Sequence, residues 1–249
     1  MLTQERYDLI LKAVNEKITV NVAELTHLTG ASESTIRRDL IALDEMKLLT
    51  KIHGGATALR ENYAIVEEDV FTKIQKNKEE KDRIAQYAAS LVNDNDFVMI
   101  DAGTTTDRLI EYLDRTSKAT FVTNGITHGE KLVRKGLKTY VLGGMIRPVT
   151  EAIVGTEALE NLRRYNFTKC FVGVNGITVE NGYTTPNIEE AAVKREILKH
   201  SYMKVILADY TKFGITASIN FGDIGEACII TDRRPEEKYM DATVIKEAK

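Results

Sequence analysis

The 249-residue sequence has only two cysteines and three prolines, and it has no tryptophan. Cys170 and Cys228 each lie in an apolar, strand-like run, which is typical of reduced core residues and not of a disulfide or metal pair. The N-terminus has no apolar secretory segment, and no apolar run approaches the length of a membrane span. The formal net charge of −3 argues against general binding to nucleic acid or membrane surfaces. These features predict a cytoplasmic protein without a membrane partner.

The spacings that mark metal and nucleophile sites are also missing. The four histidines are scattered without ligand spacing, and HxxE, CxxC and GxSxG arrangements do not occur. We therefore expect no metal, no cofactor and no catalytic residue.

The segment that follows Gly30 has the pattern of a capped amphipathic helix. Gly30 suits a turn, because positive φ costs glycine little, and Ser32 is a good N-cap residue. Ile36, Leu40 and Leu43 recur at helical spacing and form one apolar stripe. A capping-box pattern at Asn21 and Glu24 predicts a short preceding helix, which leaves a tight turn between the two.

A glycine-tipped hairpin is expected after this helix, with Leu48, Leu49 and Ile52 as strand residues. Helix, turn, helix and hairpin in this order predict a winged helix-turn-helix that places one helix in the major groove. Hydroxyl and guanidinium groups near the helix start suit contacts to phosphates and base edges. The predicted contacts to double-stranded operator DNA are Ser32, Ser34, Thr35, Arg37, Arg38, Lys51, His53, Gly54 and Gly55.

The charge of this segment limits how it can bind DNA. Residues 1–58 carry seven Lys and Arg against eight Asp and Glu, so counterion release over a broad surface cannot dominate. Binding then needs a local cluster, formed by Arg37, Arg38, Lys51 and His53, and two or more copies of the domain. An adaptor whose winged helix binds protein is the alternative that a near-neutral domain also fits.

Three segments follow from the pattern: a DNA-binding domain at 1–58, a charged connector at 59–80, and a larger domain at 81–249. In the larger domain, apolar strands alternate with helices, which predicts a largely parallel α/β sheet covered on both faces. The expected strands are 97–100, 120–123, 139–142, 170–174, 205–208 and 227–230. The connector is expected to pass into a helix that runs to about residue 91, and the further expected helices are 103–113, 129–134, 157–164 and 189–200.

Small and polar residues follow several of these strands, at the edge where parallel sheets bind ligands. Asp101 and the Gly103-Thr104-Thr105 run end the first strand and open a helix, which favours an anion such as phosphate. An ordinary threonine-capped turn is the simpler interpretation of that run. The pair Glu190 and Lys194 has the spacing of an ion pair on a helix surface.

Taken together, these motifs resemble the DeoR family of bacterial transcriptional regulators over nearly the whole chain. The most specific part is the run from Ser32 to Leu40 followed by His53-Gly54-Gly55-Ala56. The second domain adds similar blocks at 101–105, 123–124, 143–144, 173–176, 190–195 and 209–214.

The resemblance implies a sugar-operon repressor whose second domain is similar to the ribose-5-phosphate isomerase and CoA-transferase fold. It further implies a homo-oligomer, a dimer or tetramer, and a phosphorylated sugar as effector. Gly103, Thr104 and Thr105 would hold the phosphate. Asp101, Asn124, Lys194, Asp209 and Lys212 would line the sugar site. To these we add Gly143 and Asn175, which follow expected strands, and Lys81, a lysine of the connector that could reach a phosphate.

We therefore expect repression by operator binding, controlled by a sugar phosphate. A fructose phosphate is the sugar indicated by overall similarity to fructose- and lactose-operon repressors. The alternative is a sugar-phosphate isomerase with an appended DNA-binding module, which would need Asp101, Asp209 or Glu190 as its acid or base.

Overall fold

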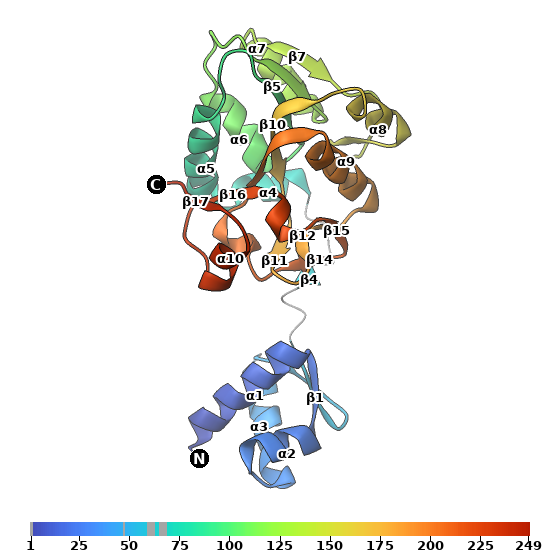
Figure 1. Cartoon of the computed structure of the whole chain (residues 1–249). Helices are drawn as coiled ribbons and strands as arrows, with labels where there is room; N and C mark the ends of the chain where they lie inside the picture. Colours follow the sequence, from blue (N-terminus) through green and yellow to red (C-terminus); the bar gives the residue numbers. More distant parts are fainter. Residues whose placement is uncertain (1, 47, 59–62, 65–68) are drawn as a thin grey trace. The chain divides into compact units, whose positions relative to one another are not determined.

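The structure is a computed structural model that describes every residue except 1, 47, 59–62 and 65–68 (Figure 1). The chain divides into two compact units, Met1–Asn62 and Tyr63–Lys249, and each is described by itself. Of the predicted connector, residues 59–62 and 65–68 lie outside the described part of the chain.

The first unit is a helix-turn-helix with a small antiparallel sheet. Its elements are α1 (Thr3–Lys17), β1 (Thr19–Asn21), α2 (Val22–Thr29), α3 (Glu33–Glu45), β2 (Thr50–Ile52) and β3 (Gly55–Thr57), and the strand order is β1-β3-β2. The predicted stripe of Ile36, Leu40 and Leu43 is buried, and it packs with Ile10 and Leu25 in one core.

The predicted helix caps of this unit are confirmed. Asn21 Oδ1 accepts a hydrogen bond from the Glu24 amide at 2.8 Å, and Glu24 Oε2 accepts one from the Asn21 amide at 3.0 Å. The Ser32 hydroxyl accepts from the Thr35 amide at 3.3 Å. Both caps fix amides that a helix start leaves without a partner in the helix.

The predicted strand boundaries of the wing were partly wrong. Leu48 and Leu49 lie in a bend before β2, with Leu48 exposed and Leu49 fully buried in the core. The strand β1, which supplies the third member of the sheet, was not predicted. Its three residues are too short to show a pattern, and its pairing partner β3 is distant in sequence.

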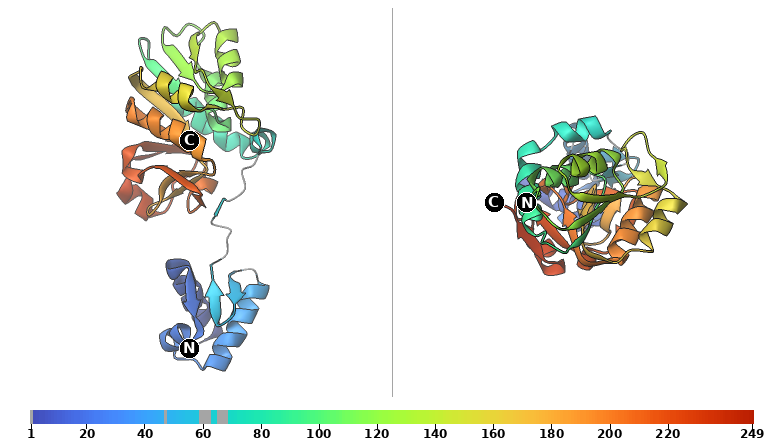
Figure 2. Two further views of the ribbon diagram at one scale, coloured as in Figure 1. Left: turned by 90° about the vertical axis from the view of Figure 1, so that its right-hand side faces the viewer. Right: turned by 90° about the horizontal axis from the view of Figure 1, so that it is seen from above.

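A seven-stranded parallel sheet forms the centre of the second unit (Figures 1 and 2). Its order is β17-β16-β13-β10-β5-β6-β7. The strands are β5 (Phe97–Ile100), β6 (Thr120–Thr123), β7 (Lys138–Val141), β10 (Phe167–Gly173), β13 (Ser201–Leu207), β16 (Cys228–Thr231) and β17 (Ile245–Glu247). Six of them match the predicted strands, and β17 was not predicted.

Alternate residues of these strands enter two different cores, as a sheet covered on both faces requires. Val98 and Phe121 lie in the core that also contains Ile84 and Leu109. Those two residues come from α5 (Lys78–Ser90) and α6 (Thr104–Tyr112), and α7 (Ile126–Arg134) covers the same face. The predicted parallel α/β architecture is therefore confirmed.

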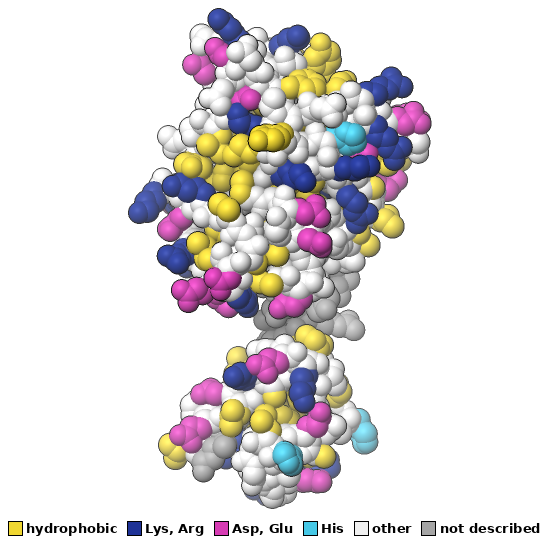
Figure 3. Space-filling model, in the orientation of Figure 1, with side chains coloured by type: hydrophobic (Ala, Val, Ile, Leu, Met, Phe, Trp, Pro, Cys, Tyr) yellow, Lys and Arg dark blue, Asp and Glu magenta, His cyan; other side chains and the backbone are white. Residues whose placement is uncertain are grey.

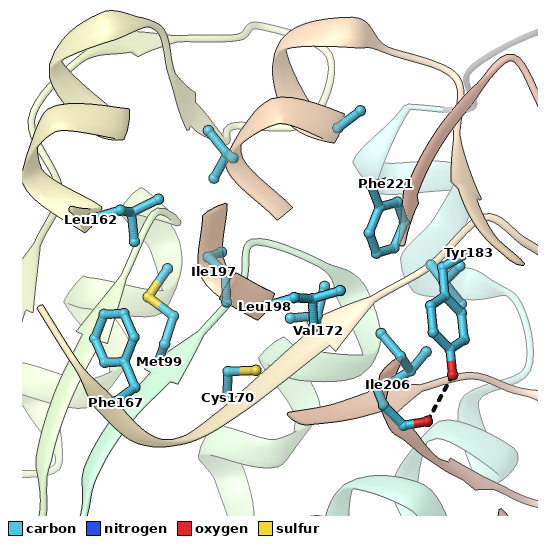
Figure 4. Close-up of a cluster of buried hydrophobic side chains, with 14 of the residues drawn as sticks. Met99, Leu162, Phe167, Cys170, Val172, Tyr183, Ile197, Leu198, Ile206 and Phe221 are labelled. Carbon is cyan, nitrogen blue, oxygen red and sulfur yellow. Dashed lines mark hydrogen bonds between the residues drawn. The ribbon is translucent and has the colours of Figure 1, made fainter. Parts of the chain in front are cut away.

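The opposite face packs against α8 (Thr156–Leu162) and α9 (Ile188–Lys199). Figure 4 shows this core, in which Met99, Cys170 and Val172 meet Leu162 and Ile197. Cys170 is fully buried and Cys228 half-buried, and both thiols are free. Burial raises the pKa of Cys170 to about 11.

Shorter elements were not predicted from the sequence, because each has too few residues to show a period. They are β4 (Tyr63–Ala64), α4 (Val70–Gln75), β8 (Met145–Ile146), β9 (Ile153–Val154), β11 (Gly176–Thr178), β12 (Gly182–Thr185), β14 (Thr216–Ala217), β15 (Ile219–Gly222), α10 (Glu237–Ala242) and two 3₁₀ turns at Tyr210–Lys212 and Ile224–Glu226. Within the described residues, no helix is long and apolar enough to cross a membrane.

The strand order reverses direction between β5 and β10. From β5 the chain builds outward through β6 and β7, and it then returns to the other side of β5 with β10 and the strands that follow. In open parallel sheets, ligands bind beyond the carboxyl ends of the strands at such a reversal. This position defines where a ligand pocket is expected.

Candidate functional site

The first half of α3 exposes the polar residues that the sequence singled out. Ser34, Arg37 and Arg38 are exposed and Thr35 is half-buried, while Ile36 points into the core. The α3 surface therefore presents hydroxyl and guanidinium groups while its apolar stripe anchors the helix.

Three cations on α3 and β2 are exposed, and they differ in their partners. Arg37 Nη2 lies 3.3 Å from Glu33 Oε2, one turn earlier on the same helix. Arg38 and Lys51 have no ion pair with any described residue of the chain. Acidic and basic side chains are interspersed on the visible face of this unit (Figure 3). The structure thus retains the near-neutral character that favours focused contacts.

A buried ion pair beneath α3 was missed from the sequence. Arg6 of α1 donates to Asp39 through Nε at 2.5 Å and Nη2 at 2.9 Å, and the two side chains are 13% and 6% exposed. Forked contacts of this kind fix geometry as well as charge. The pair ties α1 to the exposed helix, and 33 residues separate its members, so no local pattern reveals it.

The wing turn uses its two glycines for different reasons. Gly54 has φ of +82°, in the left-handed region that favours glycine, and a Cβ there would meet open space. A Cβ on Gly55 would lie 2.1 Å from the Val20 carbonyl oxygen, because β1 and β3 pair directly at this point. His53 is exposed next to the turn.

A pocket lies in the second unit at the carboxyl ends of β5 and β10, and we call it lobe 1. The structure brings eight of the eleven predicted effector residues to its lining: Lys81, Gly103, Thr104, Thr105, Asn175, Lys194, Asp209 and Lys212. Asp101, Asn124 and Gly143 do not line it.

Asp101 and Lys194 form a buried ion pair at the floor of lobe 1. Lys194 Nζ contacts Asp101 Oδ2, and their side chains are 5% and 2% exposed. The same Oδ2 accepts the Gly173 amide at 3.0 Å, and Lys194 also donates to the Gly173 carbonyl at 3.1 Å. The pair therefore locks the ends of β5 and β10 together.

The other two predicted residues have positions that differ from each other. Asn124 is buried behind the pocket, and its Oδ1 accepts the Ala102 amide at 2.8 Å, which holds the loop before α6. Gly143 is exposed, and its amide donates to Asn161 Oδ1 at 3.1 Å. Asn124 can act on a ligand by positioning this loop. Gly143 is not among the residues that line lobe 1.

The N-terminus of α6 faces lobe 1 through Gly103, Thr104 and Thr105. Amides in the first turn of a helix have no partner within the helix and attract anions. The Thr106 hydroxyl is already engaged, because it donates to backbone carbonyls of Asp101 and Gly103 at 2.5 and 2.8 Å. The Gly103 amide donates to His128 Nε2 at 3.4 Å, so the GTTT run offers the amides of Thr104 and Thr105 and two hydroxyls to a ligand.

Asp209 supplies a buried carboxylate with one unsatisfied oxygen. Its Oδ1 accepts Asn77 Nδ2 at 3.0 Å and the Thr211 amide at 3.1 Å. Its Oδ2 is buried without a hydrogen-bond partner among the described residues, and Lys212 Nζ lies 4.0 Å away. A buried oxygen of this kind is costly unless a ligand or water donates to it.

Lysines from α4 and α5 complete the lining, and those on α4 were not included in the predicted effector site. Lys81 is buried, at 5% exposure, and donates to the carbonyl of Lys73. Lys73 and Lys76, within and just after α4, also line lobe 1. The sequence signal for them was the charged run at 60–81, which does not show which lysines reach a pocket.

The predicted surface pair of Glu190 and Lys194 is wrong. Both side chains are buried, and they have different partners. Glu190 Oε1 accepts Arg147 Nη1 at 2.5 Å and the Thr150 hydroxyl, while Lys194 contacts Asp101. The two residues do have i,i+4 spacing, but each forms its ion pair with a residue that is distant in sequence and follows another strand.

The first unit is a helix-turn-helix, and the second is an α/β domain with a lysine-rich pocket where the strand order reverses. This combination defines the class of a DNA-binding regulator that senses a small molecule. The family model for the DeoR-like helix-turn-helix domain matches residues 6–62, and the model for the DeoR C terminal sensor domain matches residues 76–233. The chain therefore belongs to the DeoR family of transcriptional regulators.

Similar full-length proteins support this assignment. The uncharacterized HTH-type transcriptional regulator FruR of Bacillus subtilis (strain 168) is 41% identical over 252 residues, which cover 100% of both chains. The HTH-type transcriptional repressor GlcR of the same organism is 30% identical and covers 97% of this chain and 93% of its own. The lactose phosphotransferase system repressor of Staphylococcus aureus (strain N315) is 34% identical, with 96% and 95% covered.

Among solved structures, ribose 5-phosphate isomerase A of Methanocaldococcus jannaschii aligns with a TM-score of 0.43 and 13% identity. The alignment covers 55% of each chain. The eIF2B delta subunit of Chaetomium thermophilum aligns with a TM-score of 0.42 and 16% identity over 61% of this chain and 59% of that one.

The family assignment decides between the alternatives left open by the sequence. The chain is a transcriptional regulator and not an isomerase, and its helix-turn-helix is of the DNA-binding type instead of an adaptor for protein. The second unit contains its sensor domain, and the lining of lobe 1 lies within the matched range except for Val70 and Lys73.

Proposed function

We propose that the chain is a cytoplasmic repressor of a sugar-utilisation operon, and that a phosphorylated sugar bound in lobe 1 controls its affinity for operator DNA. The phosphate would lie against Gly103 and the amides of Thr104 and Thr105, beside the lysines of the pocket. A sugar hydroxyl would donate to the free oxygen of Asp209, and Asn175 would read a second hydroxyl. The name of the lactose phosphotransferase system repressor noted above supports a sugar as the ligand class.

One observation carries this proposal. The α6 N-terminus, five lysines and a buried carboxylate oxygen that has no donor among the described residues line the same pocket. The lysines and amides complement an anion, whereas the lone carboxylate oxygen needs a donor such as a hydroxyl. A phosphorylated sugar carries both groups on one small molecule, and an inorganic anion carries only the first.

The DNA side of the proposal uses repeated, focused contacts. Arg37 and Arg38 would reach base edges or phosphates from α3. The DNA backbone would be contacted by the wing, through Lys51, His53 and the wing glycines. Because the unit is nearly neutral, a homo-oligomer on a repeated operator would supply the affinity that one copy lacks. A fructose phosphate is the first candidate among the effectors.

Fluorescence anisotropy with the full chain and a labelled fragment from upstream of its own gene tests this function. A panel of sugar phosphates is titrated beside the parent sugars and inorganic phosphate. We expect at least one sugar phosphate to change the operator Kd by about tenfold or more, which corresponds to about 1.4 kcal/mol of coupling. The parent sugars should have no effect.

Two lysine variants make the test specific to lobe 1. Lys212→Ala removes a cation from the lining and should reduce the effector response while leaving operator affinity in the absence of effector unchanged. Lys138→Ala removes an exposed cation of β7 outside the pocket and should respond like the parent chain. An operator affinity that no sugar phosphate changes would rule out the proposed control.

A further inference from the structure

A second hollow, which we call lobe 2, adjoins lobe 1. The two share Val70, Ala102, Gly103, Thr104 and Thr150 in their linings. The remaining walls of lobe 2 come from α4, from α6, from the start of α7 and from the segment between β8 and β9, and they include Phe71, Ile74, Asp107, Ile126, His128 and Glu151. A ligand held at Gly103 and Thr104 therefore borders both lobes.

The two lobes differ in charge. Among the described lining residues, lobe 1 has five lysines against two acids, whereas lobe 2 has one lysine against two acids. The lysine of lobe 2 is Lys131, and its ammonium is taken up by Asp107 at 2.7 Å and Glu111 at 3.1 Å. Among the described residues that line lobe 2, no unpaired cation is thus left to neutralise a phosphate.

The two carboxylates that line lobe 2 are hydrogen-bond acceptors. Asp107 Oδ1 is buried and has no hydrogen-bond partner among the described residues, although Oδ2 of the same carboxylate binds Lys131. Glu151 Oε2 accepts the Thr127 hydroxyl at 2.8 Å. His128 contributes no positive charge near neutral pH, because burial lowers its pKa. These groups suit hydroxyl donors.

Apolar side chains form the rest of the lobe 2 wall. Phe71 and Ile74 of α4 are 73% and 41% exposed, and Ile126 at the start of α7 is 41% exposed. A mostly apolar wall with a few oriented acceptors is typical of a pocket for a neutral small-molecule group. The carbon face and hydroxyls of a sugar have this combination.

We propose that lobe 2 binds the uncharged, hydroxylated end of the effector whose phosphate occupies lobe 1. The effector is then a sugar monophosphate, and a bisphosphate is rejected, because its second phosphate would face the carboxylates of Asp107 and Glu151. The one described lysine of this lobe, Lys131, is already paired with Asp107 and Glu111. This inference rests on the proposed function and adds the number and placement of phosphates. In this arrangement α4 would contact the ligand in both lobes.

Isothermal titration calorimetry with the full-length chain tests the placement directly. The probes are inorganic phosphate, fructose 1-phosphate, fructose 6-phosphate, fructose 1,6-bisphosphate and the corresponding three glucose phosphates. We expect the tightest monophosphate to bind at least about tenfold more tightly than the bisphosphate of the same sugar, because like charges brought together in an interface are strongly unfavourable.

A cation introduced into lobe 2 should reverse this preference. Ile126→Arg is expected to weaken the tightest monophosphate at least about fivefold and to bring the affinity of the bisphosphate to that of the monophosphate or above it. Inorganic phosphate, which needs lobe 1 alone, should bind this variant as it binds the parent chain. Val133→Arg adds the same charge to an exposed position of α7 outside the lining and should change neither affinity.

Phe71→Ala adds a test that introduces no charge. It should weaken the monophosphate and leave inorganic phosphate unchanged, because Phe71 lines lobe 2 and not lobe 1. A bisphosphate that binds the parent chain as tightly as a monophosphate would overturn the inference alone. Equal monophosphate affinity in Ile126→Arg, Phe71→Ala and the parent chain would also overturn it. Failure of every sugar phosphate to bind would overturn the proposed function with it.

Discussion

Lys194 of α9 and Asp101 at the end of β5 form an ion pair that is almost completely removed from solvent, with side chains 5% and 2% exposed. The pair joins the two strands between which the sheet order reverses, because both members also bind the backbone of Gly173 at the end of β10. The floor of lobe 1 therefore depends on two charges from distant parts of the chain.

Removing one charge should destabilise the sensor domain. We expect Lys194→Met to lower its free energy of unfolding by about 3–5 kcal/mol, because the Asp101 carboxylate would remain buried without a counterion. Urea unfolding followed by circular dichroism measures this change. The double variant Asp101→Asn with Lys194→Met should recover much of the loss, since neither charge then remains.

Lys199→Met on the same helix provides the control. Lys199 is 70% exposed and lies 3.8 Å from Glu196, so its loss should cost less than about 1 kcal/mol. If Lys194→Met were no more damaging than Lys199→Met, the ion pair would not be holding the two strand ends together.

The regular elements of both units could be predicted because their signals are local. The stripe of Ile36, Leu40 and Leu43, the cap at Ser32 and the apolar strand runs each occupy one continuous segment. The carboxyl ends of parallel strands meet at one edge, so Asp209 and the GTTT run could be expected near each other without knowledge of their contacts.

The contacts that build the site could not be predicted, because their members lie far apart in the sequence. Arg6 and Asp39 are separated by 33 residues, and Lys194 and Asp101 by 93. A helix position shows which residues are neighbours along one face but not which strand end will approach it. Glu190 illustrates this: its local partner was expected to be Lys194, and its actual partners are Arg147 and Thr150.

Arg38 should make a direct contribution to operator recognition. It is exposed on α3 and has no ion pair among the described residues, so DNA does not have to displace a protein partner. We expect Arg38→Ala to weaken specific operator binding by about 1–3 kcal/mol, as measured by anisotropy at fixed salt. Lys12→Ala on α1 serves as the control, and equal effects of the two substitutions would contradict a role for Arg38 in recognition.

Glu33 should restrain Arg37 and oppose DNA phosphates. The two side chains are 62% and 59% exposed and form a pair at 3.3 Å, which Glu33→Gln would break. We expect tighter operator binding, by about two- to fivefold, because the guanidinium is released and a negative charge is removed from the contact surface. Glu16→Gln removes an acid from another exposed i,i+4 pair of this unit and should have less effect. Weaker binding by Glu33→Gln would contradict the expectation.

The two wing glycines should respond differently to alanine. Gly55→Ala places a Cβ 2.1 Å from the Val20 carbonyl oxygen, so the β1–β3 pairing must open and operator binding should be lost. Gly54→Ala meets open space at φ of +82° and should cost about 1 kcal/mol of stability, with most operator binding retained. Thermal unfolding and anisotropy on the two variants distinguish packing from backbone conformation, and equal losses would contradict this division.

His128 should make the sensor domain less stable in mild acid. Its ring is buried, and Nε2 lies 3.1 Å from the Gly103 carbonyl and 3.3 Å from the Thr106 hydroxyl, at the loop that faces the phosphate position. Burial lowers its pKa below the ordinary value of 6.5. The unfolded chain therefore binds a proton at a higher pH than the folded chain does.

The direction in which stability changes with pH follows from this difference in proton binding. Well above pH 6.5 both states hold a neutral ring, and His128 does not make the free energy of unfolding change with pH. As the pH falls below 6.5, the unfolded state takes up the proton first, so stability decreases until the folded pKa is reached. Urea unfolding at pH 7.5 and 5.5, compared between the parent chain and His128→Gln, isolates this contribution because other titrating groups are common to both. The parent chain should lose more stability between the two pH values than His128→Gln does, while the exposed-site control His53→Gln should follow the parent. Equal losses in the parent chain and His128→Gln would show that the buried ring does not set the acid response.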